Sequence, residues 1–198
     1  MNMNSTITHN YARLRKPLFF LPILLLVLLI LFLYFNHALN VYGYTVIQKN
    51  SFFTINAYLG QYPNLESNFT QFGDCLISLS LLSVFVLYAP KLWEALISAS
   101  LISAFFSIVL KVAFAVPRPA AVFNQTSFLI TGKMLLGNNS LPSGHSITIF
   151  TTLTVIMYAF MPQRLSYKIM WFFCLTCIGL MLALSRVALG AHYPLDVV

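Results

Sequence analysis

The stretch Ser185–Asp196 reads Ser-Arg-Val-Ala-Leu-Gly-Ala-His-Tyr-Pro-Leu-Asp and closes a long apolar run. It places Arg186, His192 and Asp196 close together in a chain that has only four carboxylates. If the backbone is helical from His192 onward, Asp196 lies one turn later on the same face and can accept the ring N–H of His192. The other ring nitrogen then stays free for nucleophilic attack, and Arg186 offers a planar fork of donors to an anion. The stretch predicts a histidine nucleophile beside an anion clamp, or else a capped helix end with an incidental histidine.

The composition of the chain is that of a membrane protein. Of its 198 residues, 59% are hydrophobic and 8% are charged, whereas a soluble domain carries about 25% charged residues. This length accommodates five or six spans of roughly 20 apolar residues each. The net charge of +7 does not indicate nucleic-acid binding, because the basic residues are scattered at the ends of apolar runs and form no known binding motif. We therefore expect the bilayer as a partner and no nucleic acid.

Apolar stretches predict an all-α fold, a polytopic transmembrane helical bundle with five spans. The expected spans cover residues 17–35, 72–89, 92–115, 142–160 and 169–185. Positive charge falls at Arg13, Arg15 and Lys16, at Lys91, and at Arg164 and Lys168, which places these segments on the cytoplasmic side. Segments 36–71, 117–141 and the residues after 185 then share the opposite side. Within the first of these, residues 52–59 form either an interfacial helix or a plain loop.

Two further polar clusters fall on that opposite side. Lys111 lies inside the third span, where an ammonium either serves a function or snorkels to the interface, and Arg118 follows seven residues later. Ser143, Gly144 and His145 begin the fourth span. A helix N-terminus there offers free N–H groups to an anion, Gly144 admits a ligand close to the backbone, and His145 can protonate a leaving group. The alternative is a serine cap beside a structural histidine.

Together these clusters supply three cations, helix-end amides, a hydroxyl, two histidines and one carboxylate. Such a set selects a multiply charged anion and favours phosphate over carboxylate. No second carboxylate stands nearby to complete a metal cage, so we expect no metal and no other cofactor. Cys75, Cys174 and Cys177 lie in apolar stretches and are expected as core residues. The residues predict metal-independent phosphoryl transfer through a phosphohistidine.

These residues resemble the three-part signature of the type 2 phosphatidic acid phosphatase superfamily. The matching parts are Lys111 with Arg118-Pro119, then Pro142-Ser143-Gly144-His145, and then Ser185-Arg186 with His192 and Asp196. The resemblance covers residues 72–198 and implies a six-helix membrane core. It implies that His192 is the nucleophile, that Asp196 orients it, and that His145 is the general acid. The phosphate would be held by Lys111, Arg118, Ser143, Gly144 and Arg186.

The resemblance implies a lipid phosphate phosphatase of the bacterial inner membrane with its active site facing the periplasm. Undecaprenyl pyrophosphate, phosphatidylglycerol phosphate, phosphatidic acid and lipid A phosphates are all candidate substrates, and the sequence does not choose among them or fix an oligomeric state. A lipid-to-lipid phosphotransferase and a non-catalytic anion-binding membrane protein are the alternatives. The apolar spans argue against the soluble vanadium haloperoxidases of the same family.

The expected organisation has three parts. Residues 1–16 form a cytoplasmic segment, residues 17–71 hold the first span and an extracytoplasmic segment, and residues 72–198 form the phosphatase core. The family has a sixth span after its third signature part, whereas residues 193–198 are too short to cross a bilayer. We therefore expect the core to be incomplete at its C-terminus, as in a fragment that lacks its last span.

Overall fold

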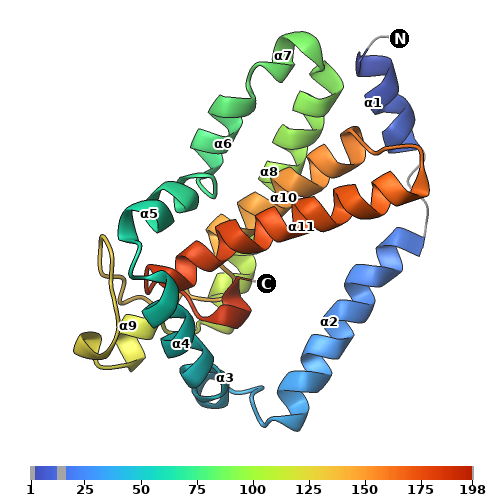
Figure 1. The fold of residues 1–198 in the computed structure, drawn as a ribbon. Helices are drawn as coiled ribbons and strands as arrows, with labels where there is room; N and C mark the ends of the chain where they lie inside the picture. Colours follow the sequence, from blue (N-terminus) through green and yellow to red (C-terminus); the bar gives the residue numbers. More distant parts are fainter. Residues whose placement is uncertain (1–2, 13–16, 198) are drawn as a thin grey trace.

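A computed structural model of the protein describes residues 3–12 and 17–197, which form helices and loops and no β-strand. Helix α10 (Gly144–Ala159) packs against both α8 (Pro90–Phe114) and α11 (Leu165–Ala188), as Figure 1 shows. The C-terminal ends of α8 and α11 and the N-terminal end of α10 meet at one end of this bundle. This shared end carries all three polar clusters.

Two segments are long and apolar enough to cross a membrane. They are Pro90–Val122, which comprises α8 and the short α9 (Pro119–Val122), and Leu165–Ala188, which is α11. Pro22–Phe35 and Gly144–Ala159 are apolar but shorter. The all-α fold is thus confirmed with two candidate spans, while the five-span bundle stays a prediction.

The stretch 72–89 does not form one continuous helix. It is divided into α6 (Cys75–Leu82) and α7 (Phe85–Tyr88), with a break at Ser83. There the Ser83 hydroxyl donates to the carbonyl of Ser80 at 2.7 Å. Such a bond from a side chain to the backbone offers an alternative to the helical ladder. Hydropathy does not reveal this local hydrogen bond, and the stretch expected to form the second span is divided between two helices.

The segment between the first two apolar stretches is helical for most of its length. It contains α3 (Val41–Ile47), α4 (Lys49–Leu59) and α5 (Pro63–Gln71). Residues 52–59 therefore lie in a helix rather than a loop. Helices α4 and α5 both pack against α11, and in Figure 1 they cover the end of the bundle that carries the polar clusters.

The N-terminal segment also docks onto the bundle, at its other end. Helix α1 (Met3–Ala12) packs against α8 and α10, and its Ile7 side chain is fully buried. The amide of Asn10 donates to the carbonyl of Ala159 at 2.8 Å, and the Tyr11 hydroxyl donates to the carbonyl of Val155 at 3.2 Å. These contacts fasten α1 to the C-terminal end of α10, far from the polar clusters.

Helix α2 (Pro17–Phe35) has the bounds expected of the first span. It stands apart from α10 and α11 in Figure 1, and most of its large apolar side chains from Ile23 onward are exposed. A continuous apolar surface of this kind requires an apolar environment, which a bilayer provides. Three of the basic residues used for orientation, Arg13, Arg15 and Lys16, lie outside the described residues.

Helix α11 is apolar on its inner and its outer face. Gly179 lies on the inner face, where a Cβ would stand 2.7 Å from the Phe150 ring, so the glycine lets α10 approach closely. Cys174 and Cys177 are exposed, and Cys75 is half-buried. The expectation that the two α11 cysteines are core residues is wrong, because a helix that is apolar all round gives no sequence signal for its inner face.

Candidate active site

Backbone hydrogen bonds join the three polar clusters at the shared end of the bundle. The N–H of Arg118 donates to the carbonyl of Gly137 at 3.0 Å. The N–H of Ser143 donates to the carbonyl of Asp196 at 2.9 Å. The loops after α8 and α11 are thereby held against the start of α10, and residues far apart in sequence become neighbours.

His192 and Asp196 meet, although not on an α-helix. His192 is 2% exposed, and its Nδ1 lies 3.5 Å from Asp196 Oδ2. The backbone between them forms the single 3₁₀ turn η2 (Pro194–Asp196). Proline fixes its own φ and starts such a turn readily. The contact is long for a hydrogen bond, as is common for catalytic groups before the substrate binds.

Three other donors hold the Asp196 carboxylate. The Tyr44 hydroxyl donates to Oδ1 at 2.7 Å, while the Ser140 hydroxyl at 2.5 Å and the Tyr193 N–H at 2.9 Å donate to Oδ2. A buried carboxylate is costly unless it is hydrogen-bonded, and these three donors supply hydrogen bonds to both of its oxygens. Burial and the Asp196 charge raise the pKa of Tyr44 far above its usual value, so this phenol remains a donor.

The partners of His192 select its tautomer. The Arg118 Nη1 lies 3.3 Å from Nε2, and a guanidinium can only donate. Nε2 therefore accepts, and Nδ1 carries the proton toward Asp196 and toward the Ser140 hydroxyl oxygen at 3.5 Å. Burial lowers the pKa of His192 to about 4, although Asp196 acts in the opposite direction. His192 is thus neutral at pH 7, with an unprotonated Nε2 whose lone pair faces the Arg118 guanidinium.

Two arginines frame this lone pair. Arg118 is 7% exposed, and it also donates from Nε to Asn139 Oδ1 at 2.8 Å and from Nη1 to the carbonyl of Ala191 at 3.0 Å. Arg186 donates from Nη1 to the Thr70 hydroxyl at 3.0 Å. The Arg186 Nε is buried and has no partner among the described residues. Because an unpaired buried donor is costly, this nitrogen indicates where an anion binds.

Lys111 approaches the N-terminus of α10. Ser143 caps this helix by accepting the N–H of Ser146 at 3.4 Å. A Cβ on Gly144 would stand 3.5 Å from Lys111 Nζ, so the glycine leaves the space between the lysine and the first helical turn open. Free N–H groups, the helix dipole and an ammonium together form an anion site.

His145 follows in the same turn, and its surroundings are looser. Its side chain is half-buried, and no described residue forms a hydrogen bond with its ring. It interacts electrostatically with Arg186 and His192. A Cβ on Gly73 would stand 2.6 Å from the His145 Cβ, so only glycine lets the loop after α5 lie against it. His145 is at the site with its ring nitrogens free to exchange a proton.

Sequence reasoning missed several residues that position this site. Asn139 lies in the loop before α10, next to Ser140 and four residues before the helix cap Ser143. Tyr44 and Thr70 belong to helices with no motif, and only the fold brings them to Asp196 and Arg186. Asn56 is 1% exposed, and its side chain bonds the backbone of Leu129 and of Ala188. Buried polar side chains of this kind give no local sequence signal.

The arrangement suits phosphoryl transfer. A neutral histidine nitrogen faces Arg118. Arg186, Lys111 and a helix N-terminus lie at the same end of the bundle, and together these groups can bind a phosphate and stabilise its transition state. Among the described residues, no group of three or more His, Cys, Asp or Glu side chains could hold a metal ion. An all-helical fold with two candidate membrane spans and this cluster is the combination expected of a membrane phosphatase.

Comparison with known proteins gives the family. The PAP2 superfamily matches residues 91–198, and the chain belongs to this superfamily. Its fold is similar to the crystal structure of Aquifex aeolicus LpxE, with a TM-score of 0.60 and 24% sequence identity over 76% of this chain and 86% of that one. No curated protein matches the chain. Tyr44, Asn56 and Thr70 lie before the matched region.

Proposed function

We propose that the protein hydrolyses a phosphate mono- or diphosphate ester of a membrane lipid through a phosphohistidine on His192, without a metal ion. The observation that carries this proposal is the placement of His192. Its Nδ1 is backed by Asp196, while its Nε2 faces Arg118. A nucleophile oriented by a carboxylate and facing an anion clamp is the arrangement that covalent phosphoryl transfer requires.

The reaction then has two steps that balance. In the first, Nε2 of His192 attacks phosphorus, the bond from phosphorus to the lipid oxygen breaks, and His145 gives a proton to the leaving oxygen. In the second, His145 takes a proton from water, the resulting hydroxide attacks phosphorus, and the P–N bond breaks to release inorganic phosphate. Asp196 keeps the Nδ1 proton in place throughout.

The charge that accumulates on the phosphoryl oxygens is stabilised by Lys111, Arg118, Arg186 and the N–H groups that begin α10. These groups are fixed before the reaction, which is the condition for efficient electrostatic stabilisation. We infer that they replace the metal ion that other phosphatases use. Excess chelator should leave the rate unchanged, and vanadate should inhibit by mimicking the five-coordinate transition state.

The test is phosphate release from a panel of lipid phosphates in detergent, with His192→Ala as the matched control. Release by the wild type, persistence in chelator and an acid-labile phosphoenzyme absent from the variant are expected. Loss in chelator that magnesium restores would contradict the mechanism. Radiolabel that appears in a second lipid rather than in inorganic phosphate would identify a phosphotransferase instead.

We also propose that the site faces the periplasm of a bacterial inner membrane. The shared end of the bundle opposes the end that carries Lys91, Arg164 and Lys168, and positive loops stay cytoplasmic. In a chain whose three cysteines are replaced, a single cysteine at exposed Asn138 should react with an impermeant reagent from outside, and one at exposed Arg164 should not. The reverse pattern would overturn the orientation.

A further inference from the structure

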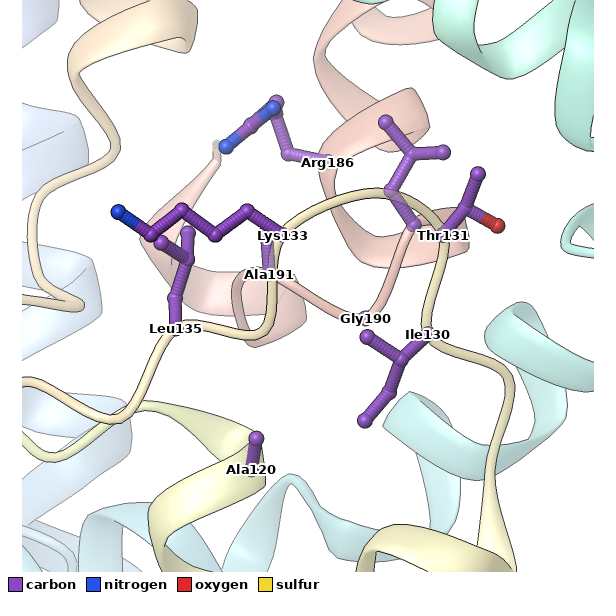
Figure 2. Close-up of a pocket in the computed structure, with 9 residues that line it drawn as sticks. Ala120, Ile130, Thr131, Lys133, Leu135, Arg186, Gly190 and Ala191 are labelled. Carbon is purple, nitrogen blue, oxygen red and sulfur yellow. The ribbon is translucent and has the colours of Figure 1, made fainter.

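A small cavity opens beside the candidate active site. Its volume is about 180 Å³, and its walls include Ala191, which precedes His192, and the Arg186 side chain. Lys133 and Thr131 line it from the loop between α9 and α10. In Figure 2 the Lys133 and Arg186 side chains extend toward the same side of the view.

Hydrogen bonds hold the backbone of residues 129–131, just before Lys133, in place. Asn56 accepts the N–H of Leu129 at 2.8 Å and donates to its carbonyl at 2.9 Å. The N–H of Thr131 donates to the carbonyl of Leu189 at 3.3 Å. A Cβ on Gly190 would stand 2.7 Å from the Leu129 carbonyl oxygen, so the loop lies directly on the end of α11. Lys133 is exposed, but its backbone is held at the rim of the site.

The charge of this cavity is entirely positive. None of the four carboxylates of the chain lines it. The ion pairs among the described residues are Lys91–Glu94 and His192–Asp196, so Lys133 has no carboxylate partner there. Lys111, Arg118 and Arg186 already match a single phosphate, which carries about two negative charges. A fourth cation on the same cavity indicates a ligand with further negative charge next to the reacting phosphate.

We propose that Lys133 binds the second phosphoryl group of a lipid diphosphate and thereby determines specificity for diphosphate over monophosphate. The inference rests on the proposed function. Arg186 is shared between the cavity and the reacting phosphate, which places the second anionic group next to the first, as are two phosphoryl groups joined by a bridging oxygen. At about 180 Å³ the cavity is smaller than a pocket for a whole drug-sized ligand, and it suits a headgroup whose chain stays in the bilayer.

The residues already described can carry out the cleavage of a lipid diphosphate. His192 attacks the terminal phosphorus, the bond to the bridging oxygen breaks, and the lipid leaves as its monophosphate. The leaving group is a phosphate with a second pKa of about 6, so it needs little proton donation from His145. Lys133 stabilises the charge that appears on it. Water then hydrolyses the phosphohistidine and releases inorganic phosphate.

The experiment compares farnesyl diphosphate with farnesyl monophosphate, which share one chain, on the full chain in detergent. Lys133→Ala should lower kcat/KM for the diphosphate about tenfold, as for the loss of one hydrogen bond to a charged group, and should lower the monophosphate value much less. Lys133→Arg should keep the wild-type ratio of the two values, because it keeps the charge. Lys168→Ala, at a half-buried lysine near the opposite end of α11, is the control that should change neither.

The outcomes separate this inference from the function on which it rests. If the wild type cleaves neither compound nor any other lipid phosphate, the proposed function fails and the role of Lys133 fails with it. If the wild type cleaves monophosphates but no diphosphate, the function stands and the diphosphate assignment is overturned. An equal loss on both substrates in Lys133→Ala, or the same change in ratio in Lys168→Ala, also overturns it.

Discussion

The two histidines of the site lie in opposite kinds of surroundings. His192 is 2% exposed, and both its ring nitrogens face partners, with Asp196 and Ser140 at one and Arg118 at the other. His145 is half-buried, and none of the described residues forms a hydrogen bond with its ring. A nucleophile must keep one tautomer and one orientation, whereas a general acid must lose and regain a proton. The contrast supports nucleophilic attack by His192 and proton exchange by His145.

Removing His192, whose two ring nitrogens both have partners, should have the largest effect on the rate. In His192→Ala no nitrogen can form the covalent intermediate, so turnover should disappear for every substrate, whatever its leaving group. The measurement is phosphate release together with trapping of the labelled phosphoenzyme. A labelled enzyme in this variant, or a rate that recovers with a better leaving group, would show that the nucleophile is elsewhere.

Removing the negative charge of Asp196, which orients His192, should have the second-largest effect on the rate. In Asp196→Asn an amide N–H can donate to Nδ1, which favours the tautomer that carries its proton on Nε2 and blocks attack. We expect a loss of about 10³–10⁴-fold, as for the equivalent change in other histidine–aspartate pairs. Circular dichroism and thermal unfolding in detergent would verify that the variant is folded. A folded variant with a loss below tenfold would mean that Ser140 alone sets the tautomer.

Removing His145, whose ring has no hydrogen-bond partner among the described residues, should lower the rate less. The size of the loss should depend on the substrate. In His145→Ala the leaving alkoxide goes unprotonated, a loss of about 10²–10⁴-fold for general acid catalysis. The loss should shrink for nitrophenyl phosphate, whose leaving group is a weak base. The measured quantity is the ratio of variant to wild-type rate on nitrophenyl phosphate and on an alkyl lipid phosphate. Equal ratios would refute the general-acid role, and recovery by His192→Ala instead would reverse the two assignments.

The contrast also explains how much of the site the sequence could predict. The three polar clusters fall next to helix ends, and loop charge predicts that those ends share a side, so their meeting follows from hydropathy and helix chemistry. The pairing of His192 with Asp196 was expected from an i,i+4 helical spacing, but Pro194 makes a 3₁₀ turn there. The structure brings the two side chains together, but on a different backbone from the one expected.

The sequence did not predict the residues that position Asp196, the partner of His192. Tyr44 reaches Asp196 from a helix more than 150 residues earlier in the chain, and its contact depends on how α3 lies against η2. Gln48 fixes that relation, since its Oε1 accepts the N–H of Leu195 at 2.7 Å. Long-range contacts of this kind follow from packing, which local patterns do not encode. The break at Ser83 and the outer position of Cys174 went unrecognised for other reasons. The first involves a local hydroxyl-to-carbonyl hydrogen bond, and the second lies on a helix that is apolar all round.

The smallest effect, and the one that best tests the positioning of Asp196, is expected from Tyr44→Phe. The variant keeps the buried ring among Phe52 and Tyr193 and removes the hydroxyl that donates to Asp196 Oδ1 and also interacts with the Gln48 side chain. A net value of about 0.5–1.5 kcal/mol for such a bond corresponds to a loss of roughly two- to tenfold at pH 7. Tyr42→Phe is the matched control, because Tyr42 lies on the same helix and is exposed.

The pH profile separates a positioning role of Tyr44 from a merely structural one. Burial lowers the pKa of His192 to about 4, so its attacking form is complete at pH 7 and is lost only as pH falls through that value. Without the Tyr44 donor, the Asp196 charge acts more fully on the imidazolium and raises the pKa of His192, which moves the acidic limb of kcat/KM to higher pH. Ionisation of the substrate cancels in the ratio of variant to wild type measured on one substrate. A ratio that falls as pH is lowered for Tyr44→Phe and stays flat for Tyr42→Phe is expected, whereas two flat ratios would mean that Tyr44 only fills space.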